Sequence, residues 1–572
     1  MSRFIFLILF LACFAPLQVE AATVNAESAS LAHVSAAIAA ANPGDTVVVP
    51  IGTATWEETL VITRGIVLQG AGAGQTVITG AAAISTPTYG VIRYAPSAAA
   101  ITADDPFRIT GFTISALGDV YGITVYQNTS TPITKVRIDN NSLSVAGNAR
   151  NVYIVGSVYG VVDSNTITET GTGSKAIDTY GNNTTQWESP ALAFEYGTRN
   201  NMYSEDNTIN HQTTPHSSGQ GGRYVVRYNT YNYSGTSHLS PWYDAHGNQH
   251  NCPPDGIGDD CTYENWGTMG VEIYGNAIDA GAKTVAPMFD IRGGQAIAFN
   301  NHVTTSYLSG ESSHIREEVA DDSNPILERH PSAPMHVNNA YFWANYVNED
   351  LLPVAESSDC CDAIAENSEF YNYTATFDGT VGIGSGLYAD MPATCTVGVA
   401  YWATDKGGNW HLTNETENDG TLYKCTEINT WTDYYTPYTY PHPLRDATAP
   451  ESTITQSDPQ AITSDALTLT GTCTDVVGVT SAKYRLSSSP DGSDGTACTG
   501  TTSWTCNTGG YSIGANDVYV GCADAAGNWT SPAPHITANF SYPSGAIAFS
   551  SPGTGAITLT PNNAGAITVT PY

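Results

Sequence analysis

The chain has 572 residues, which is too long for one ordinary hydrophobic core, so at least two domains are expected. Acidic residues outnumber basic ones 54 to 20, and the net charge of −34 argues against nucleic acid as a partner, because phosphate binding needs a basic surface. Only 13% of residues are charged, while glycine (54) and tyrosine (33) are abundant, which is typical of an extracellular all-β protein with many turns.

The first 22 residues have the features of an export signal. Arg3 precedes the apolar run 4–17, and the small residues Ala21 and Ala22 follow it. This run is too short to span a bilayer comfortably, and no later segment qualifies, so no transmembrane segment is expected. We therefore expect residues 1–22 to be removed and the mature protein to be secreted, either free or held at the cell surface.

The cysteines predict disulfides. Of the 11 cysteines only Cys13 lies in the signal, which leaves ten, an even number, in an oxidising compartment. Proximity in sequence predicts three pairs: Cys252 with Cys261, Cys395 with Cys425, and Cys498 with Cys506. Cys473 with Cys522 would then staple the C-terminal domain. The adjacent Cys360 and Cys361 stay unassigned. No pair of cysteines has zinc-ligand spacing.

The first predicted elements are an alanine-rich helix over residues 28–41 and a strand at 47–49. Together with Pro43-Gly44-Asp45-Thr46 and the run 65–72, this opening resembles the start of pectate-lyase-like proteins. In that superfamily the helix caps the open end of the coil and prevents edge-to-edge pairing. The resemblance implies an all-β fold, a right-handed single-stranded parallel β-helix with an N-terminal capping helix, over residues 23–445.

Seven asparagines recur in one local setting, each followed two residues later by an apolar side chain: Asn141, Asn165, Asn207, Asn229, Asn276, Asn301 and Asn345. They are 24, 42, 22, 47, 25 and 44 residues apart. The short steps match one coil of a β-helix, and the long steps match a coil with an inserted loop. Asparagine tolerates the left-handed conformation that a corner requires, and stacked amides can hydrogen-bond along the axis. The 47-residue step would separate the site described below if it held two coils.

The β-helix is expected to close with the aromatic, proline-rich segment 434–443, packed as a lid over the last coil. Beyond it, the segments 471–475 and 522–529 resemble bacterial immunoglobulin-like modules, which implies a small β-sandwich over residues 446–540. Residues 541–572 repeat Gly-Ala-Ile every ten residues and are predicted to be a flexible tail. Strand addition to another chain, giving surface attachment or self-association, is the alternative.

Outward side chains at equivalent positions of successive coils form columns about 4.8 Å apart. A four-residue strand ending in glycine recurs 9–15 residues after the asparagines. Because side chains alternate, its first and third residues share a face. The first column is predicted to be Tyr153, Asp178, His216, Asp244 and Asp290. The third is predicted to be Val155, Tyr180, Ser218, His246 and Arg292.

These columns place Asp244 over Asp290 and His246 over Arg292. Two stacked carboxylates repel, so one must be protonated, paired with Arg292 or His246, or bound to a cation. A purely structural surface would not need this costly arrangement, although a solvated salt-bridge ladder is the plain alternative. The neighbouring Trp242 and Tyr243 offer apolar faces of the kind that sugars stack on, and Asp178 and Tyr180 are expected to contact substrate.

Three mechanisms fit these residues. In a lyase, Arg292 or His246 abstracts the proton beside a uronate carboxylate while Asp244 and Asp290 hold calcium. In a glycoside hydrolase the two carboxylates act as acid and as base or nucleophile. In a non-catalytic binder the same residues hydrogen-bond sugar hydroxyls, and the fold alone does not choose. The strand at 289–294 resembles the arginine-bearing coil of alginate and chondroitin lyases, with His246 in place of the lysine expected on the preceding coil.

A second outward column lies two residues before each asparagine: Asp139, Asp163, Glu205, Arg227, Tyr274, Phe299 and Trp343. Arg223, Arg227 and Glu272 are expected to pair there and are second-choice substrate-binding residues. The loop 251–261 resembles a thrombospondin type 3 calcium repeat, so Asp255, Asp259 and Asp260 are candidate calcium ligands, with a metal-free disulfide loop as the alternative. The predicted function is cleavage of an extracellular polysaccharide by β-elimination, with hydrolysis and glycan binding as alternatives.

Overall fold

The computed structural model describes residues 22–541 apart from 104, 128, 130, 172, 182–194, 234–240, 248, 252–261, 266, 282–287, 306–312, 316–336, 357–363, 414–416, 447, 476–478, 491–494 and 525–527, together with 557–559 and 567–569. The chain divides into two compact units, one from Ala21 to His442 and one from Pro443 to the C-terminus. Within the described residues, no helix is long and apolar enough to span a membrane.

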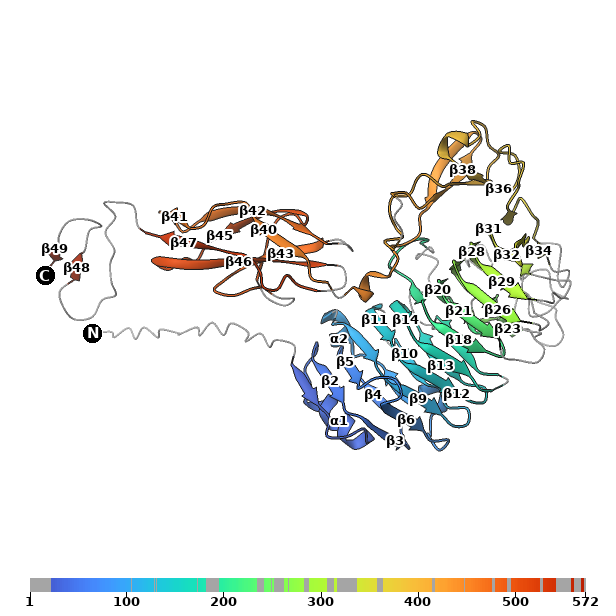
Figure 1. Cartoon of the computed structure of the whole chain (residues 1–572), viewed down its shortest axis with the longest axis horizontal. Coiled ribbons are helices and arrows are strands. Elements are labelled where there is room, and N and C mark those ends of the chain that lie inside the picture. The colour runs from blue at the N-terminus through green and yellow to red at the C-terminus, as the bar shows by residue number, and fades with distance from the viewer. Residues whose placement is uncertain are drawn as a thin grey trace, which may run out of the picture. The chain divides into compact units, whose positions relative to one another are not determined.

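The first unit winds through three long parallel sheets in turn, in the order A, B, C, as Figure 1 shows. Sheet A contains, in spatial order, β1 (Thr23–Asn25), β2 (Thr46–Val49), β5 (Val67–Gly70), β8 (Phe107–Thr110), β11 (Ile133–Asp139), β14 (Val158–Asp163), β17 (Met202–Glu205), β20 (Arg223–Arg227), β25 (Gly270–Tyr274), β28 (Gln295–Phe299), β31 (Ala340–Trp343) and β35 (Phe370–Asn372).

Sheet B contains β3 (Gly52–Trp56), β6 (Thr76–Gly80), β9 (Thr113–Ala116), β12 (Ser142–Val145), β15 (Thr166–Glu169), β18 (Thr208–His211), β21 (Thr230–Tyr233), β26 (Ala277–Gly281), β29 (His302–Thr305), β32 (Tyr346–Val347) and the antiparallel β33 (Asp350–Leu351).

Sheet C contains β4 (Leu60–Ile62), β7 (Ile92–Tyr94), β10 (Ile123–Tyr126), β13 (Arg150–Val155), β16 (Lys175–Tyr180), β19 (His216–Gly219), β22 (Tyr243–Ala245), β27 (Phe289–Ile291), β30 (His314–Ile315) and β34 (Ala355–Glu356). Each strand pairs in parallel with its counterpart one coil away, which confirms the predicted parallel β-helix. The predicted right-handed sense is the one that parallel crossovers take.

Few helices accompany these sheets in the described residues. Helix α1 (Leu31–Ala40), inside the predicted range 28–41, begins after the N-cap Ser30 and buries Val34 and Ile38. It lies at the N-terminal end of the stack (Figure 1). Helix α2 (Ala98–Ala103) and the 3-10 turn Pro87–Tyr89 lie in loops. A hairpin of β23 (Gln249–Asn251) and β24 (Thr262–Asn265) projects from the coil that holds β22.

The asparagines form the predicted ladder along the corner between sheets A and B. In the six asparagines from Asn141 to Asn301, the side-chain Nδ2 donates to the Oδ1 of the next asparagine of the ladder, at 2.8–3.2 Å. The left-handed conformation belongs to the residue before each asparagine, for example Asn140, Ser164 and Asp206, so the expectation that the asparagine itself adopts it was wrong. The asparagine instead satisfies the backbone groups that the corner exposes, since Asn165 Nδ2 also donates to the carbonyl of Ile138 at 2.8 Å.

All three long asparagine steps are single coils. Across the 47-residue step, β20 pairs with β25, β21 with β26 and β22 with β27. The 42- and 44-residue steps pair in the same way. The extra residues are therefore insertions, and the register of the columns is continuous through the site.

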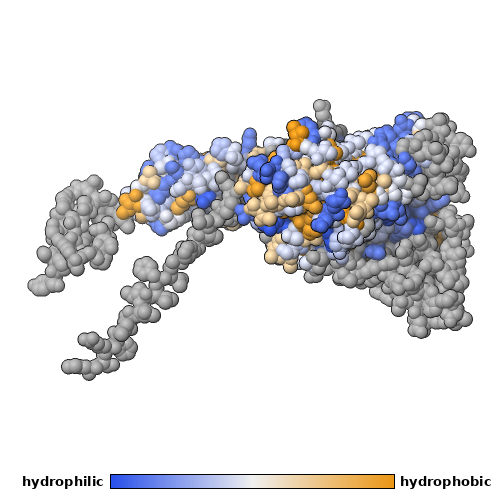
Figure 2. All heavy atoms as spheres, turned by 90° about the horizontal axis from the view of Figure 1, so that it is seen from below, coloured by the Kyte–Doolittle hydropathy of each residue, from blue (hydrophilic) through white to orange (hydrophobic). Residues whose placement is uncertain are grey.

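The segment 434–442 lies along the outer face of sheet A, not over the last coil as predicted. It follows a four-stranded sheet of β36 (Ile383–Gly386), β37 (Ala400–Ala403), β38 (Thr421–Glu427) and β39 (Thr430–Tyr435), near the 3-10 turn Tyr388–Asp390. Arg227 donates to the carbonyls of Tyr438 and Thr439 at 2.6 and 2.8 Å, so the segment is held against strands in the middle of the stack. On the face that Figure 2 shows, hydrophobic residues are scattered among hydrophilic ones.

The second unit is built from two antiparallel-rich sheets around one core. One sheet contains β40 (Glu451–Ile454), β42 (Leu467–Thr474) and β45 (Ser503–Thr508); the other contains β41 (Gln460–Ile462), β47 (His535–Phe540), β46 (Gly514–Asp524), β43 (Val479–Leu486) and β44 (Thr496–Ala497). The unit begins with the 3-10 turn Pro443–Arg445, and β48 (Ile557–Leu559) pairs with β49 (Ile567–Val569) in the predicted tail.

Three of the predicted disulfides are present: Cys395–Cys425, Cys473–Cys522 and Cys498–Cys506. The latter two lie in the second unit, where Cys473, Cys506 and Cys522 are buried in the core. The predicted pair Cys252–Cys261 and the adjacent Cys360 and Cys361 lie outside the described residues.

Candidate functional site

The outer face of sheet C carries a continuous column of polar and aromatic side chains. Its register is Arg93, Thr124, Tyr153, Asp178, Ser217, Asp244, Asp290 and His314. Asp244 and Asp290 are neighbours, as predicted. At β19 the prediction was wrong by one residue, because Ser217 stands where His216 was expected.

His216 points into the interior. It pairs in register with Ile177 and Tyr243, and its ring lies 5.9 Å from the Tyr243 ring, stacked with it. Burial, with a smaller contribution from His211, lowers the pKa of His216 to about 3, so this imidazole is neutral. The same one-residue shift puts Gly219, not Ser218, in line with Tyr180, and Ser218 Oγ is buried 2.7 Å from Thr268 Oγ1.

Four residues of sheet C form what we call the site cluster: Asp244, His246, Asp290 and Arg292. Arg292 donates to Asp244 Oδ1 from Nε at 3.1 Å and from Nη2 at 2.7 Å, and its Nε lies 3.5 Å from Asp290 Oδ2. His246 Nε2 lies 3.0 Å from Asp244 Oδ2. The side chains of Asp244 and Arg292 are 8% and 10% exposed and that of His246 is 20% exposed, so the imidazole is the most accessible of the three.

The hydrogen bonds of the cluster define the protonation of its members. Arg292 Nη2 lies 2.5 Å from His246 Nδ1, and a guanidinium only donates, so Nδ1 accepts and Nε2 carries the hydrogen that faces Asp244. Burial alone would raise the pKa of Asp244, but its contacts with His246 and with the guanidinium of Arg292 outweigh burial and lower that pKa well below its usual range. Asp244 is therefore ionised and orients the imidazole.

Tyr180 approaches the cluster from the preceding coils because Gly219 leaves space for it. A Cβ on Gly219 would lie 3.0 Å from Tyr180 Cε1 and 3.4 Å from His246 Cβ. The ring centroids of Tyr180 and His246 are 6.4 Å apart, and Tyr180 Oη is 3.4 Å from Ser217 Oγ, which is 3.4 Å from Asp244 Oδ2. Burial raises the pKa of Tyr180 well above its usual value, so the phenol keeps its proton. Neither Ser217 nor Gly219 was predicted.

Two residues predicted to stack on sugars are core residues. Trp242 and Tyr243 are fully buried. Alternation along β22 turns Tyr243 and Ala245 inward when Asp244 and His246 point outward, and Trp242 packs edge-on against His211 at 5.2 Å. These two side chains therefore offer no surface to a substrate, and their predicted role was wrong.

Asp178 is also unavailable to a substrate. Its side chain has no exposed area, Arg150 Nε lies 2.7 Å from Oδ2, and Lys175 Nζ lies 4.0 Å from Oδ1. Asp178 is thus the counter-ion that holds two cations on the outer face of sheet C. Its predicted contact with substrate was therefore wrong; Arg150 and Lys175, its two partners, are 18% and 17% exposed.

Arg223, Arg227 and Glu272 lie on sheet A, and the structure does not bring them to the site cluster. Arg227 is fully buried and lies 2.7 Å from Glu205 Oε2, and Arg223 is 3% exposed with a pKa lowered by burial. Glu272 accepts hydrogen bonds from Gly197 N at 2.8 Å and Tyr435 Oη at 2.9 Å. Arg227 and Glu272 hold the segment 434–442 against sheet A, and Arg223 is buried, so the predicted substrate contacts of all three were wrong.

Asp244 and Asp290 do not fit a calcium ion as they stand. Calcium takes six to eight oxygen ligands, whereas Arg292 lies against both carboxylates and His246 against Asp244. We route no chemical step through a metal at this cluster. The other candidate ligands, Asp255, Asp259 and Asp260, lie outside the described residues, and calcium in that loop stays a prediction.

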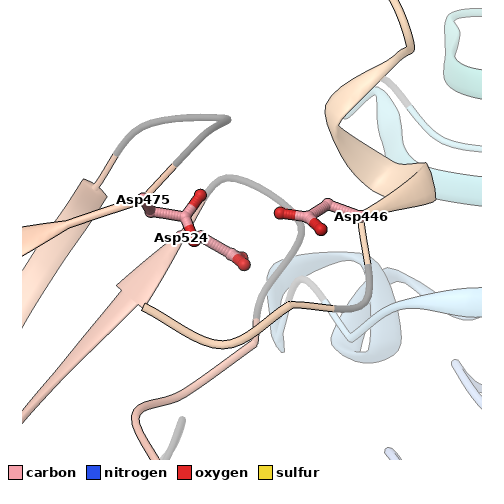
Figure 3. A group of neighbouring side chains, drawn as sticks. All are labelled: Asp446, Asp475 and Asp524. Atoms are coloured by element: carbon pink, nitrogen blue, oxygen red, sulfur yellow. The ribbon is translucent and has the colours of Figure 1, made fainter. Parts of the chain in front are cut away.

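Another acidic group lies in the second unit (Figure 3). Asp446, Asp475 and Asp524 each have a carboxylate oxygen within 4.8 Å of the other two. Asn528 ties the group together, since it donates from N to Asp524 Oδ1 at 2.8 Å and from Nδ2 to the Asp446 carbonyl at 3.1 Å. Carboxylates are ligands that calcium prefers, but three of them alone do not define a metal site, and we assign no ion here.

No family model matches the chain, and none of the curated proteins matches it in sequence. Among solved structures, a family 28 exopolygalacturonase of Yersinia enterocolitica aligns with 64% of this chain and 73% of its own, at 12% identity and a TM-score of 0.25. The A-module of a mannuronan C-5 epimerase of Azotobacter vinelandii aligns with 64% of this chain and 86% of its own, at 13% identity and a TM-score of 0.19. Tailspike protein 3 of bacteriophage CBA120 aligns with 70% of this chain and 66% of its own, at 9% identity and a TM-score of 0.23. Similarity this low carries no argument about activity, which rests on the site cluster.

Proposed function

We propose that the protein is a secreted polysaccharide lyase that cleaves an acidic extracellular polysaccharide by β-elimination at the site cluster. The observation that best supports this is the position of His246, an accessible imidazole between the ionised Asp244 and the guanidinium of Arg292. A carboxylate–imidazole pair is a common proton-transferring unit. The disulfides fit an oxidising, extracellular compartment.

The arrangement suggests the course of the reaction. A uronate carboxylate pairs with Arg292, as carboxylates do with a guanidinium, and draws it away from His246 Nδ1. Nδ1 then takes the proton from the carbon next to that carboxylate, and Asp244 stabilises the imidazolium. Tyr180 gives its proton to the leaving glycosidic oxygen. One C–H bond and one C–O bond break, a carbon–carbon double bond forms, and both protons are accounted for.

Hydrolysis is the second candidate, because Asp244 and Asp290 lie on adjacent strands as a pair of carboxylates. A glycosidase needs one carboxylic acid that stays protonated near neutral pH. The pKa of Asp244 is lowered instead, so this residue is suited to orienting His246 and not to acting as the acid.

The test is to incubate the secreted chain with polygalacturonate, alginate and a neutral glucan and to follow ultraviolet absorbance. A lyase product absorbs because elimination creates a conjugated double bond. His246→Ala should lower turnover of a uronate polymer about 10²- to 10⁴-fold. The control His302→Ala removes an exposed histidine of sheet B and should leave turnover unchanged. New reducing ends without absorbance would establish a hydrolase, and binding without any product would establish a glycan-binding protein.

A further inference from the structure

We propose that Arg93 is a distal subsite that binds a second carboxylate of the same polysaccharide chain, in the outward column of sheet C that leads to the site cluster. This inference rests on the proposed function, because its ligand is the polyuronate that His246 would cleave.

Arg93 is an unusual cation in this chain. Its guanidinium carbon lies 3.5 Å from the ring centroid of Tyr89 and 4.6 Å from that of Tyr126. Its Nε is buried and has no hydrogen-bond partner among the described residues. By contrast, Arg108, Arg150 and Arg292 each have a carboxylate oxygen at 2.7 Å or less. Although acidic residues outnumber basic ones 54 to 20, Arg93 has no carboxylate partner in the described part of the chain.

The surroundings of Arg93 match a carboxylate ligand. Arg93 as a whole is only partly buried, so a carboxylate from solvent can pair with the accessible part of its guanidinium and supply the counter-ion that the described residues do not. The two tyrosine rings hold the guanidinium plane in place, so little side-chain freedom is lost on binding. Tyr89 is 42% exposed, so the stack lies at the protein surface.

Sheet C provides a path from Arg93 to the site cluster. Consecutive register partners link Arg93 to Thr124, Tyr153, Asp178, Ser217 and Asp244, which is five strand steps, or about 24 Å. Each step is comparable with the length of one pyranose residue in an extended chain. A linear polyuronate lying along the axis would therefore present a carboxylate at each end of this path.

Aromatic rings line the path between its ends. The ring centroids of Tyr121 and Tyr153 are 5.3 Å apart, those of Tyr153 and Tyr180 are 6.0 Å apart, and Tyr180 is next to His246. All three tyrosines are half-buried, with part of each ring accessible to a sugar face. Arg150, whose charge is paired with Asp178, lies 5.4 Å from the Tyr121 ring midway along the path. Cations and aromatic rings on one face of a chain of charge −34 fit an anionic glycan and not a neutral one.

The experiment measures calorimetric binding of a uronate trisaccharide and octasaccharide to the full chain carrying His246→Ala, which prevents cleavage. Arg93→Gln in this background should weaken octasaccharide binding about tenfold and leave the trisaccharide, which is too short to span the path, unchanged. Added salt should weaken binding to the parent more than to the Arg93→Gln variant. The matched control is Lys406→Gln, which removes a cation 4.8 Å from the Tyr388 ring outside sheet C and should change neither affinity.

Equal octasaccharide affinity in both proteins, or an equal loss for both oligosaccharides, would overturn the proposal. Cleavage of uronate polymers without any dependence on Arg93 leaves the lyase assignment standing and removes the distal subsite. If the wild-type chain cleaves no polymer but its binding depends on Arg93, the distal subsite stands and the lyase assignment is removed. Absence of binding by every uronate oligosaccharide overturns both. Melting temperatures of all variants are measured first, so that a folding defect is recognised.

Discussion

The outer faces of sheets A and C both carry an arginine–carboxylate ion pair, but the pair is covered on sheet A and partly exposed on sheet C. On sheet A, Arg227 lies 2.7 Å from Glu205 with both side chains fully buried. On sheet C, Arg292 lies 2.7 Å from Asp244 with 10% and 8% of their side chains exposed, next to the more accessible His246. The two ion pairs have the same length, and they differ in what covers them.

On sheet A the cover comes from the chain itself. Arg227 also donates to the backbone carbonyls of Tyr438 and Thr439, and His442 N donates to Glu205 at 2.8 Å. The guanidinium of Arg227 thus makes its hydrogen bonds within the protein. On sheet C an incoming anion can compete for Arg292. An outward charged column is therefore a binding surface only where no later segment of the chain covers it.

The largest expected effect separates these two ion pairs. Arg227→Met should lower the free energy of unfolding by about 3–5 kcal/mol, because it leaves Glu205 as an unpaired buried charge. The matched substitution Arg292→Met should cost about 1–2 kcal/mol, because His246 still hydrogen-bonds to Asp244, and should abolish turnover. Chemical unfolding and the absorbance assay measure the two. Equal losses of stability would show that exposure does not distinguish the faces.

The second prediction concerns pH. Burial raises the pKa of Glu272 to about 7, despite lowering by its hydrogen bonds from Gly197 and Tyr435 and by the charge of Arg227. A carboxyl with a raised pKa contributes stability below its unfolded pKa, and this contribution is lost as pH rises from about 4.5 to about 7. The free energy of unfolding of Glu272→Gln, measured relative to that of the wild type, should therefore rise by about 3 kcal/mol between pH 4 and pH 8.

On sheet C, Asp244 should give a pH dependence of stability of the opposite sign. Its lowered pKa means that its contribution is present at neutral pH and is lost only as pH falls below the ordinary range of a carboxyl. Thermal unfolding of Glu272→Gln, Asp244→Asn and the wild type from pH 2 to pH 8 measures both trends, since the Asp244 contribution is lost only at the acid end of this range. A Glu272→Gln difference that does not change with pH would contradict the raised pKa.

The smallest effect tests the space at Gly219. Gly219→Ala would place a Cβ 3.0 Å from Tyr180, whose ring can shift, so the free energy of unfolding should fall by less than about 1 kcal/mol. Because the displaced phenol is the proposed proton donor, turnover should fall about tenfold with little change in KM. The control is Gly74→Ala, where the added Cβ meets no atom within 4 Å but which carries a positive φ of its own. Unchanged turnover in Gly219→Ala would remove Tyr180 from the reaction.

Much of the fold followed from the sequence because the asparagine ladder marks every coil from Asn141 to Asn345. The apolar residue two positions later sets the phase of each sheet B strand, as the pairing of Leu143 with Ile167 and of Ile167 with Ile209 confirms. The ladder also brought Asp244 and Asp290 together correctly. The three described disulfides were also predictable, because an even number of cysteines in an exported chain leaves few sensible pairings.

The errors occurred where the local sequence pattern does not show whether a side chain points into the core or outward. His216-Ser-Ser-Gly219 contains no apolar residue that could set its phase, so the inward position of His216 could not be seen. Trp242 and Tyr243 are adjacent, and only alternation from Asp244 shows that Tyr243 must be inward. The cover over sheet A joins residues more than 200 positions apart, for example Arg227 and Tyr438 (separation 211), which no short-range pattern predicts. Arg93 shows no motif, and its lack of a carboxylate partner is visible only in three dimensions.

The asparagine ladder makes the length of each coil independent of the position of its strands. Most of the extra residues of the three long steps, 182–194, 248–266 and 316–336, enter between a strand of sheet C and the next strand of sheet A. The corner amides keep the neighbouring coils in register on either side of these insertions. The fold is thus a modular scaffold: sequence inserted between a strand of sheet C and the next strand of sheet A can be exchanged or grafted in evolution or in the laboratory, while the column that carries Asp244 and His246 keeps its spacing.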